Sequence, residues 1–273
     1  MINIVYCGNA GIFKGICMSL LSAQEATKEP LSVAVLTGDF TNLDKRFVPF
    51  SEKQRAALEE SLKKKNPESS IRVVDVTVPF NKELAGSPNC KSSYTPYTLL
   101  RLFLDELPNV PDKLLYLDAD TIVMKDLSLL FSTNLGDNYC AWVKDRFGRY
   151  LINPHYCNAG VILLNIPLLK KDGIFEKCKS MLRKRKWAFP DQDVLNWSTQ
   201  GRKVILPREF NEQKKLSSTT VIRHYCNQPR IFPYVHAMVC KPWDLDRVHK
   251  VYKTTVHDAL HEECRLIWRS LEK

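Results

Sequence analysis

The 273-residue sequence contains no apolar run long enough to cross a membrane. Its longest apolar stretches, such as 114–117 and 159–164, fall far short of the roughly 18 residues that a membrane-spanning helix needs. The first six residues lack the basic region and small-residue cleavage site of a signal peptide, so we expect none. With 44% apolar and 26% charged residues, the composition excludes collagen-like, low-complexity and wholly disordered chains. We therefore expect one large globular domain or two small ones.

The nine cysteines include no Cys-x-x-Cys pair, and without paired spacing a structural zinc site is not expected. Several of them lie in apolar runs, where a free thiol behaves as a small apolar side chain. An odd number of cysteines without a secretion signal predicts a reducing, cytoplasmic location.

Acidic residues are too few to balance the basic ones, and the net charge of +10 favours anionic partners. Eight basic residues fall within 170–186, which we call the basic segment. It predicts either a solvated helix face or contact with an acidic substrate or an anionic membrane surface, the latter at the inner face of the membrane. Few aromatic residues lie in or near it, Trp187 and Phe189 among them, and this argues against a nucleic acid partner.

Strand-like and helical segments alternate along most of the chain. The expected strands are 2–6, 31–37, 71–78, 113–117, 139–143 and 161–165, and the expected helices are 15–23, 52–65 and 97–107. This order predicts an α/β fold with a parallel sheet flanked by helices, which binds ligands at the carboxyl ends of its strands. Beyond residue 203 short strands give way to a helical tail from 244 onward, which we expect to be an appendage.

Two aspartates follow the apolar strand 113–117. Asp118 and Asp120 are one residue apart, so an extended backbone would point both to the same side. Their hard oxygen ligands suit a divalent cation that also holds a diphosphate. A phosphatase with Asp118 as nucleophile is an alternative, although Thr121 comes one residue early for that motif and the motif lies well inside the chain. A plain strand-end turn is the structural alternative.

A second polar segment precedes the expected strand 161–165. In it, Asn158 can hydrogen-bond a sugar hydroxyl, and Gly160 allows a ligand to approach the backbone closely. An ordinary turn would explain the same residues.

A third polar segment opens the expected helix after Phe189. Pro190 suits the first helical position, and Asp191, Gln192 and Asp193 then crowd the positive end of the helix dipole. Helix capping explains one of these polar residues easily, but all three less easily.

Taken in order, four motifs resemble glycosyltransferase family 8, the retaining galactosyl- and glucosyltransferases related to bacterial lipopolysaccharide enzymes and to glycogenin. They are LYLDAD (115–120), YCNAGVILLN (156–165), DQDVLN (191–196) and KPW (241–243). The resemblance implies a GT-A type, Rossmann-like domain over 1–245, followed by a helical tail over 246–273. It also implies transfer of a hexose from UDP-glucose or UDP-galactose to a glycan, glycolipid or glycoprotein, with Mn²⁺ or Mg²⁺ as cofactor.

The resemblance places the nucleotide against the first strand and turn, at Tyr6, Gly8 and Asn9. Residues 9–12 read Asn-Ala-Gly-Ile where the family usually has Asp-Asp-Asn-Tyr, so a UDP-binding protein without turnover is a further alternative. The other residues that the resemblance places at the donor are Arg101, Asp118, Ala119, Asp120, Asn158, Ala159, Gly160 and Lys241.

The resemblance also implies a histidine as third metal ligand beside Asp118 and Asp120. His224, which ends a short strand and precedes an aromatic residue, is favoured over His236, which lies nearer the KPW motif. Lys241 would pair with the β-phosphate, with Arg230 as the alternative.

Asp191 and Gln192 are the expected catalytic pair, which would bind the donor sugar and line the face of acceptor attack. Glutamine is a poor nucleophile, so a front-face attack assisted by the leaving phosphate is as admissible as a covalent intermediate.

Overall fold

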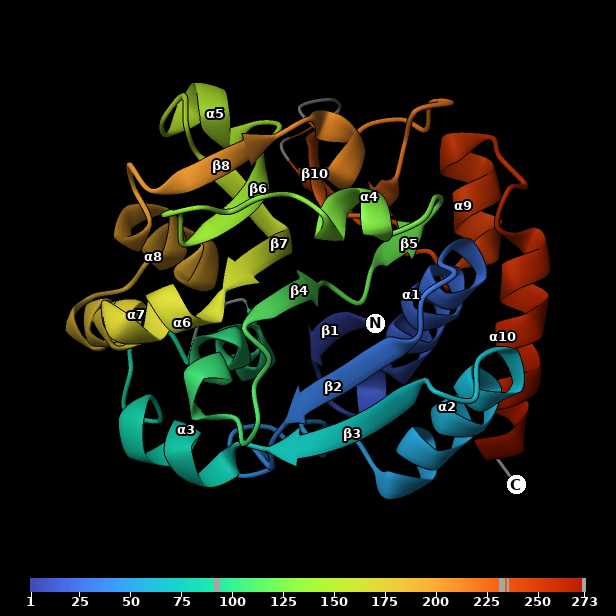
Figure 1. Cartoon of the computed structure of the whole chain (residues 1–273), viewed down its shortest axis with the longest axis horizontal. Helices are drawn as coiled ribbons and strands as arrows, with labels where there is room; N and C mark the ends of the chain where they lie inside the picture. The colour runs from blue at the N-terminus through green and yellow to red at the C-terminus, as the bar shows by residue number, and fades with distance from the viewer. Residues whose placement is uncertain (91–93, 231–233, 235, 272–273) are drawn as a thin grey trace.

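A computed structural model describes residues 1–90, 94–230, 234 and 236–271, without the side chain of Arg230. Its centre is a seven-stranded sheet in the order β3-β2-β1-β4-β7-β6-β8 (Figure 1). These strands are β1 (Ile2–Cys7), β2 (Leu31–Thr37), β3 (Ser70–Asp75), β4 (Lys113–Leu117), β6 (Cys140–Lys144), β7 (Cys157–Asn165) and β8 (Lys203–Leu206). Two small sheets pair β5 (Thr121–Val123) with β9 (Ile222–His224), and β10 (Gln228–Arg230) with β11 (His236–Met238).

Every strand of the central sheet runs parallel except β7, which is antiparallel to both of its neighbours. The beginning of β7 therefore lies at the edge where the other strands end. There the backbone N–H of Asp118 donates to the carbonyl of Gly160 at 2.8 Å. The reversed strand thus brings Asn158 and Gly160 to the edge at which ligands bind in α/β sheets. The mostly parallel sheet with helices on both sides confirms the predicted fold class.

Helices cover the two faces of the sheet, and each face has its own apolar core (Figure 1). Alternation along β1 feeds both cores, because Ile4 and Tyr6 point to one side and Val5 to the other. One face carries α1 (Phe13–Ala26), α2 (Glu52–Lys65), α9 (Leu245–Tyr252) and α10 (Asp258–Leu271). The other carries α3 (Thr77–Glu83), η2 (Pro96–Glu106), α6 (Ile166–Lys171), α7 (Ile174–Lys184) and α8 (Pro190–Ser198). Shorter helical segments are η1 (Ala10–Ile12), α4 (Ser128–Phe131), α5 (Gly148–Leu151) and η3 (Arg208–Asn211).

Three predicted elements differ from the structure. The strand predicted over 71–78 stops at Asp75, because the Asp75 carboxylate accepts a 2.7 Å hydrogen bond from the N–H of Thr77 and α3 begins there. The strand predicted over 161–165 begins at Cys157, so Asn158 and Gly160 lie inside β7 rather than before it. The predicted helix over 97–107 is a 3₁₀ segment with a kink at Phe103.

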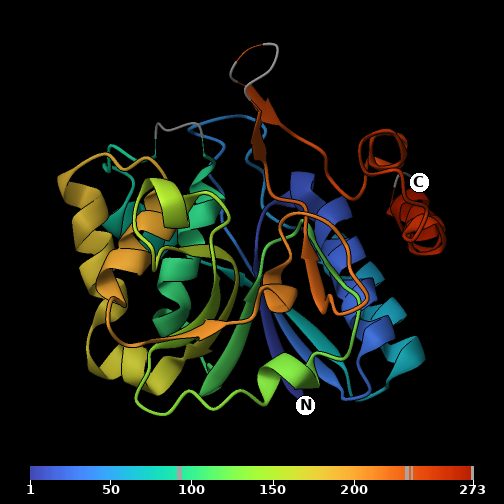
Figure 2. The same ribbon diagram turned by 90° about the horizontal axis from the view of Figure 1, so that it is seen from above.

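The expected tail 246–273 consists of α9 and α10 with a non-helical stretch at 253–257 between them, and residues 272–273 lie outside the described part. Within the tail, α10 packs against α1 and α2, while the β10–β11 hairpin projects from the body elsewhere (Figure 2). The domain boundary at residue 245 stays a prediction. All nine cysteines are free thiols. Among the described residues, no helix has the length and apolar character that spanning a bilayer requires.

Candidate active site

A cleft of about 1040 Å³ opens where the parallel strands end. Its walls come from the turn after β1, η2, the loop after β4, α5, the start of α8 and the β10–β11 hairpin. Most of the predicted site residues line it: Gly8, Asn9, Arg101, Asp118, Ala119, Asp120, Asn158, Ala159, Asp191, Gln192, His224, His236 and Lys241. The chain thus gathers motifs that are far apart in sequence around one cavity.

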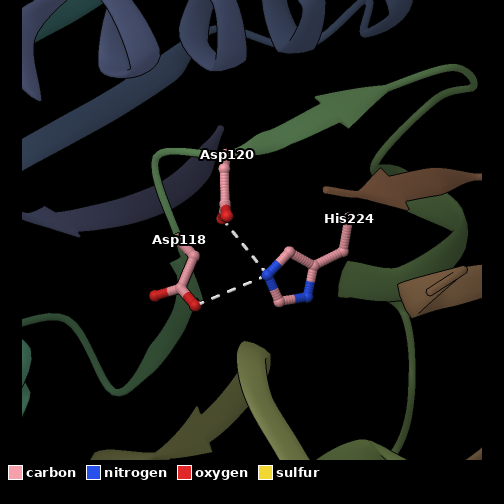
Figure 3. A group of neighbouring side chains, drawn as sticks. All are labelled: Asp118, Asp120 and His224. Carbon is pink, nitrogen blue, oxygen red and sulfur yellow. Dashed lines mark ion pairs between the residues drawn. The ribbon is translucent and has the colours of Figure 1, made fainter. Parts of the chain in front are cut away.

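Asp118, Asp120 and His224 converge within this cleft (Figure 3). Their potential ligand atoms all lie within 4.8 Å of one another. His224 Nε2 is 3.2 Å from Asp120 Oδ1 and 3.7 Å from Asp118 Oδ2. The pairing of β5 with β9 sets Thr121 opposite His224, so the small sheet carries the histidine to the aspartates.

Each side chain of this triad has one atom directed at the common centre and another held by the protein. Asp118 Oδ1 accepts from Tyr116 Oη at 2.7 Å and from an Arg101 N–H at 3.0 Å. Asp120 Oδ2 accepts from Lys241 Nζ at 2.6 Å. His224 Nδ1 lies 3.0 Å from the side-chain oxygen of Asn211. Two carboxylate oxygens and one imidazole nitrogen are a donor set that suits Mn²⁺ or Mg²⁺, and here they are oriented before a ligand arrives.

Gly160 makes room for the histidine rather than for a ligand. A Cβ at position 160 would lie only 2.1 Å from Cε1 of His224, and Gly160 is not part of the cleft wall. The sequence prediction that this glycine admits a ligand is therefore corrected, because the imidazole ring occupies the space above its Cα.

Tyr6 also does not line the cleft. Its side chain is fully buried in the core, and its hydroxyl lies 3.0 Å from Ser19 Oγ. The side chain of Tyr6 therefore packs in the core, and of the three residues predicted in the first strand and turn it is Gly8 and Asn9 that line the cleft. At the neighbouring turn, a Cβ on Gly8 would lie 2.3 Å from Ile12 Cγ2. The side chain of Ile12 therefore packs directly over Gly8 in the Asn-Ala-Gly-Ile turn.

Lys241 and Asp120 form a mostly buried ion pair. Burial raises the pKa of the Asp120 carboxyl, but the ammonium of Lys241, with His224 beside it, outweighs burial and holds that pKa well below its ordinary value. Burial lowers the pKa of Lys241, and the Asp120 carboxylate raises it further than burial lowers it. Both groups are therefore charged at neutral pH, with the ammonium next to the triad.

Arg101 connects the triad to the start of α8. Its buried guanidinium lies 3.0 Å from Asp118 and 3.3 Å from Asp191, and it stacks 4.0 Å from the centre of the Tyr116 ring. Burial raises the pKa of the Asp191 carboxyl, and Arg101 opposes that rise. One cation thus holds the two acidic motifs at a fixed separation.

Gln192 is held by the first residues of β7. Its Oε1 accepts from the backbone N–H of Ala159 at 2.9 Å and from the side-chain amide of Asn158 at 3.3 Å. The three motifs found in the sequence therefore meet through hydrogen bonds at one end of the cleft.

Two residues at this end were not predicted from the sequence. Asn211, the last residue of η3, contacts both His224 and Asn158. Asp145 follows β6, lines the cleft and accepts from the Asn158 amide at 3.0 Å. The signal for Asp145 was present, since an acidic residue follows an apolar strand just as Asp118 does. No comparable signal marks Asn211.

The alternative metal ligand His236 lies in the β10–β11 hairpin and also lines the cleft. Its Nδ1 is 2.8 Å from the carbonyl of Tyr234, and it is not a member of the acidic triad. The geometry favours His224 over His236. The side chain of Arg230, the alternative to Lys241, lies outside the described residues.

Two of the eight basic residues in the basic segment are neutralised by ion pairs with glutamates. Lys179 is buried, with its ammonium 2.8 Å from Glu83 and 2.9 Å from Glu106. Arg183 pairs with Glu176 at 2.5 Å. The remaining basic residues are exposed and form no ion pair within the described chain: Lys170, Lys171, Lys177, Lys184, Arg185 and Lys186.

Comparison with known proteins agrees with this geometry. The family model of glycosyl transferase family 8 matches residues 3–246. The lipopolysaccharide 1,2-glucosyltransferase of Escherichia coli K12 is 24% identical over 94% of this chain and 78% of its own length. The lipopolysaccharide 1,3-galactosyltransferase of Salmonella typhimurium LT2 is 30% identical over 50% of this chain and 45% of its own length.

Among solved structures, the galactosyltransferase LgtC in complex with donor and acceptor sugar analogues is similar to the whole fold. The TM-score is 0.73 at 23% identity, and the match covers 96% of this chain and 95% of LgtC. At this identity the likeness supports the fold.

Proposed function

The chain belongs to glycosyltransferase family 8, and we propose that it transfers glucose or galactose from UDP to a glycan, glycolipid or glycoprotein acceptor with retention of configuration. The observation that carries this proposal is the triad of Asp118, Asp120 and His224 with Lys241 beside it. A phosphatase with Asp118 as nucleophile is the alternative, and it would have to attack through Oδ2, because Oδ1 already accepts from both Tyr116 and Arg101.

In this proposal Asp118 Oδ2, Asp120 Oδ1 and His224 Nε2 would hold Mn²⁺ or Mg²⁺. Bound there, a divalent cation supplies positive charge that stabilises the diphosphate leaving group. Lys241 supplies a second positive charge at the same end of the cleft, because its ammonium is charged and mostly buried. Fixed charges in a buried site stabilise a developing anion far more than they would in water.

We assign the other end of the triad to the donor sugar. Arg101 and Asp191 offer a donor and an acceptor for sugar hydroxyls, and Asn158 and Gln192 complete that wall. Gln192 Oε1 is the only atom of its side chain that could attack the sugar, and it already accepts two hydrogen bonds. This engagement favours front-face attack assisted by the leaving phosphate over a covalent intermediate on Gln192.

Contact with a membrane is a separate part of the proposal. The six exposed basic residues of the basic segment offer charge for an anionic surface, and each contributes on the order of 1 kcal/mol near such a surface. The nine free thiols fit a reducing compartment. We therefore place the protein in the cytoplasm, in peripheral contact with the inner face of the membrane.

The test is hydrolysis of UDP-glucose and UDP-galactose with Mn²⁺, Mg²⁺ or a chelator, alongside thermal shifts with UDP. We expect a Mn²⁺-dependent rise in melting temperature with UDP, and metal-dependent release of UDP from one of the two donors. Binding without hydrolysis would indicate a UDP-binding protein without turnover. Release of phosphate without a nucleotide requirement would support the phosphatase. His224→Ala should lose metal-dependent hydrolysis of the donor, whereas His236→Ala should keep most of it.

A further inference from the structure

A chain of buried amides runs behind the triad, from His224 to the sugar end of the cleft. His224 Nδ1 lies 3.0 Å from Asn211 Oδ1, and Asn211 Nδ2 donates to Asn158 Oδ1 at 2.9 Å. Asn158 Nδ2 then donates to Asp145 at 3.0 Å and to Gln192 at 3.3 Å. His224 and both asparagines of this chain are at most 8% exposed.

The direction of every hydrogen bond in this chain is fixed at Asn158, because the oxygen and the nitrogen of its amide each face a group that can act in one sense only. The N–H of Gly160 can only donate, and it lies 3.1 Å from Asn158 Oδ1. The Asp145 carboxylate accepts at 3.0 Å from Asn158 Nδ2, and its other oxygen is taken by the N–H groups of Phe147 and Gly148. These anchors orient the Asn158 amide, which in turn requires that Asn211 presents its N–H to Asn158 and its oxygen to His224.

His224 therefore donates from Nδ1, because the atom that faces this nitrogen is an oxygen acceptor. The other ring nitrogen, Nε2, is the one directed at Asp118 and Asp120. The backbone keeps this contact in register, since the N–H of His224 donates to the carbonyl of Glu212 at 3.0 Å.

We propose that Asn211 is a positioning residue, which sets the tautomer and ring plane of His224 for metal binding and couples that ring through Asn158 to Gln192. This inference rests on the proposed function. Outer-sphere partners of this kind typically change metal affinity or activity by about 10- to 100-fold when they are removed.

The experiment compares three variants by the electron paramagnetic resonance signal of free Mn²⁺ in the presence of UDP, and by the kcat of UDP-sugar hydrolysis. Asn211→Ala removes both links, so we expect Mn²⁺ affinity to fall by about 10- to 100-fold, together with kcat. Asn211→Asp still accepts from His224 Nδ1 but cannot donate to Asn158, so it should keep Mn²⁺ affinity and lose kcat. Asn89→Ala is the matched control, because Asn89 is an equally buried asparagine with several hydrogen bonds outside the triad. It should leave both readouts unchanged.

Unchanged Mn²⁺ affinity in Asn211→Ala would overturn the proposal, and so would an equal loss of affinity in Asn211→Ala and Asn211→Asp. If Asn211→Ala does not fold, Asn211→Asp decides alone, because it keeps the side-chain volume: retained Mn²⁺ affinity with reduced kcat supports the proposal, and any other result overturns it. Absence of Mn²⁺ binding by the unmodified protein with UDP would instead contradict the proposed function.

Discussion

The cleft and the basic segment 170–186 both gather charged residues, but they place them differently. In the cleft, Asp118, Asp120, Arg101 and Lys241 each contact an opposite charge, and most of them are largely removed from solvent. In the basic segment six of eight cations are exposed and unpaired within the described chain. Exposed charges are screened by water and salt, whereas buried ones act on their neighbours at nearly full strength. The placement of charge, rather than the net charge of +10, therefore indicates where the chemistry of this protein takes place.

Within the basic segment, Lys179 is buried and paired like the charged residues of the cleft, and unlike its exposed neighbours. Its ammonium is buried between Glu83 and Glu106 and anchors α7 to α3 and η2. The basic segment therefore contains both buried, paired charges and exposed, unpaired ones. Variants of each kind test whether their effects on stability and binding differ.

The largest effect is expected from Asp120→Ala. This change removes a proposed metal ligand and the partner of Lys241. Changes to residues that only contact a metal ligand lower metal affinity by about 10- to 100-fold, so the affinity for UDP in the presence of Mn²⁺ should fall by more than that. Titration calorimetry with UDP and Mn²⁺ measures it. The control is Asp172→Ala, which removes an aspartate of the basic segment that pairs with Arg202. Unchanged UDP affinity in Asp120→Ala would remove the metal assignment.

A smaller but still large effect is expected from Gly160→Ala. The new methyl group would collide with the His224 ring, so the ring must move away from the aspartates. Overpacking of this kind costs about 1–3 kcal/mol of folding free energy, and Mn²⁺ affinity should fall with it. Gly86→Ala is the matched control, because a Cβ there would meet no atom within 4 Å. Calorimetry and urea unfolding together test the prediction, which fails if the two variants bind Mn²⁺ equally well.

Lys179→Met should destabilise the fold without touching the site. It leaves Glu83 and Glu106 without their ammonium partner, and because both carboxylates are partly exposed we expect a loss of about 2 kcal/mol rather than the about 3–5 kcal/mol of a fully buried pair. Lys177→Met, on the exposed side of the same helix, should change stability little. Urea unfolding measures both, and equal stability of the two variants would contradict the buried role of Lys179.

The smallest effect is expected when Arg183, Lys184, Arg185 and Lys186 are all changed to Gln. Binding to anionic liposomes should weaken and lose its salt dependence, because the change removes four positive charges that attract the anionic surface. Salt screens this attraction, over a length of about 8 Å at physiological ionic strength. UDP-sugar hydrolysis in solution should stay nearly intact, since none of these residues lines the cleft. Equal liposome binding by both proteins at low salt would leave these residues as a solvated helix face.

Local patterns predicted the parts of the fold that local forces decide. The strand 113–117 and the two aspartates after it are where the sequence places them, and the strand over 31–37 and the helix over 52–65 match residue for residue. An apolar strand and a helical spacing of apolar residues are each contained in one short segment of the sequence, so both can be predicted without knowing the rest of the chain.

Non-local packing decided what the sequence could not show. The reversed direction of β7 depends on its pairing with β4 and β6, and this direction gives Asn158 its place in the cleft. The roles of Gly160 and Asn211 both depend on where the His224 ring lies, and that follows from the pairing of β5 with β9. Single residues on unrelated segments carry no pattern from which such contacts can be predicted.

The separation of the triad along the chain has a consequence for folding. Asp118 and Asp120 are synthesised more than a hundred positions before His224, and no local turn brings them together. Contacts between such distant segments close late, because the entropy of a large loop must be lost before they can form. The ability to bind Mn²⁺ should therefore appear among the last events of refolding, well after the first strands and helices have formed. A stopped-flow experiment that follows Mn²⁺ uptake during refolding would therefore report the time at which the fold is completed.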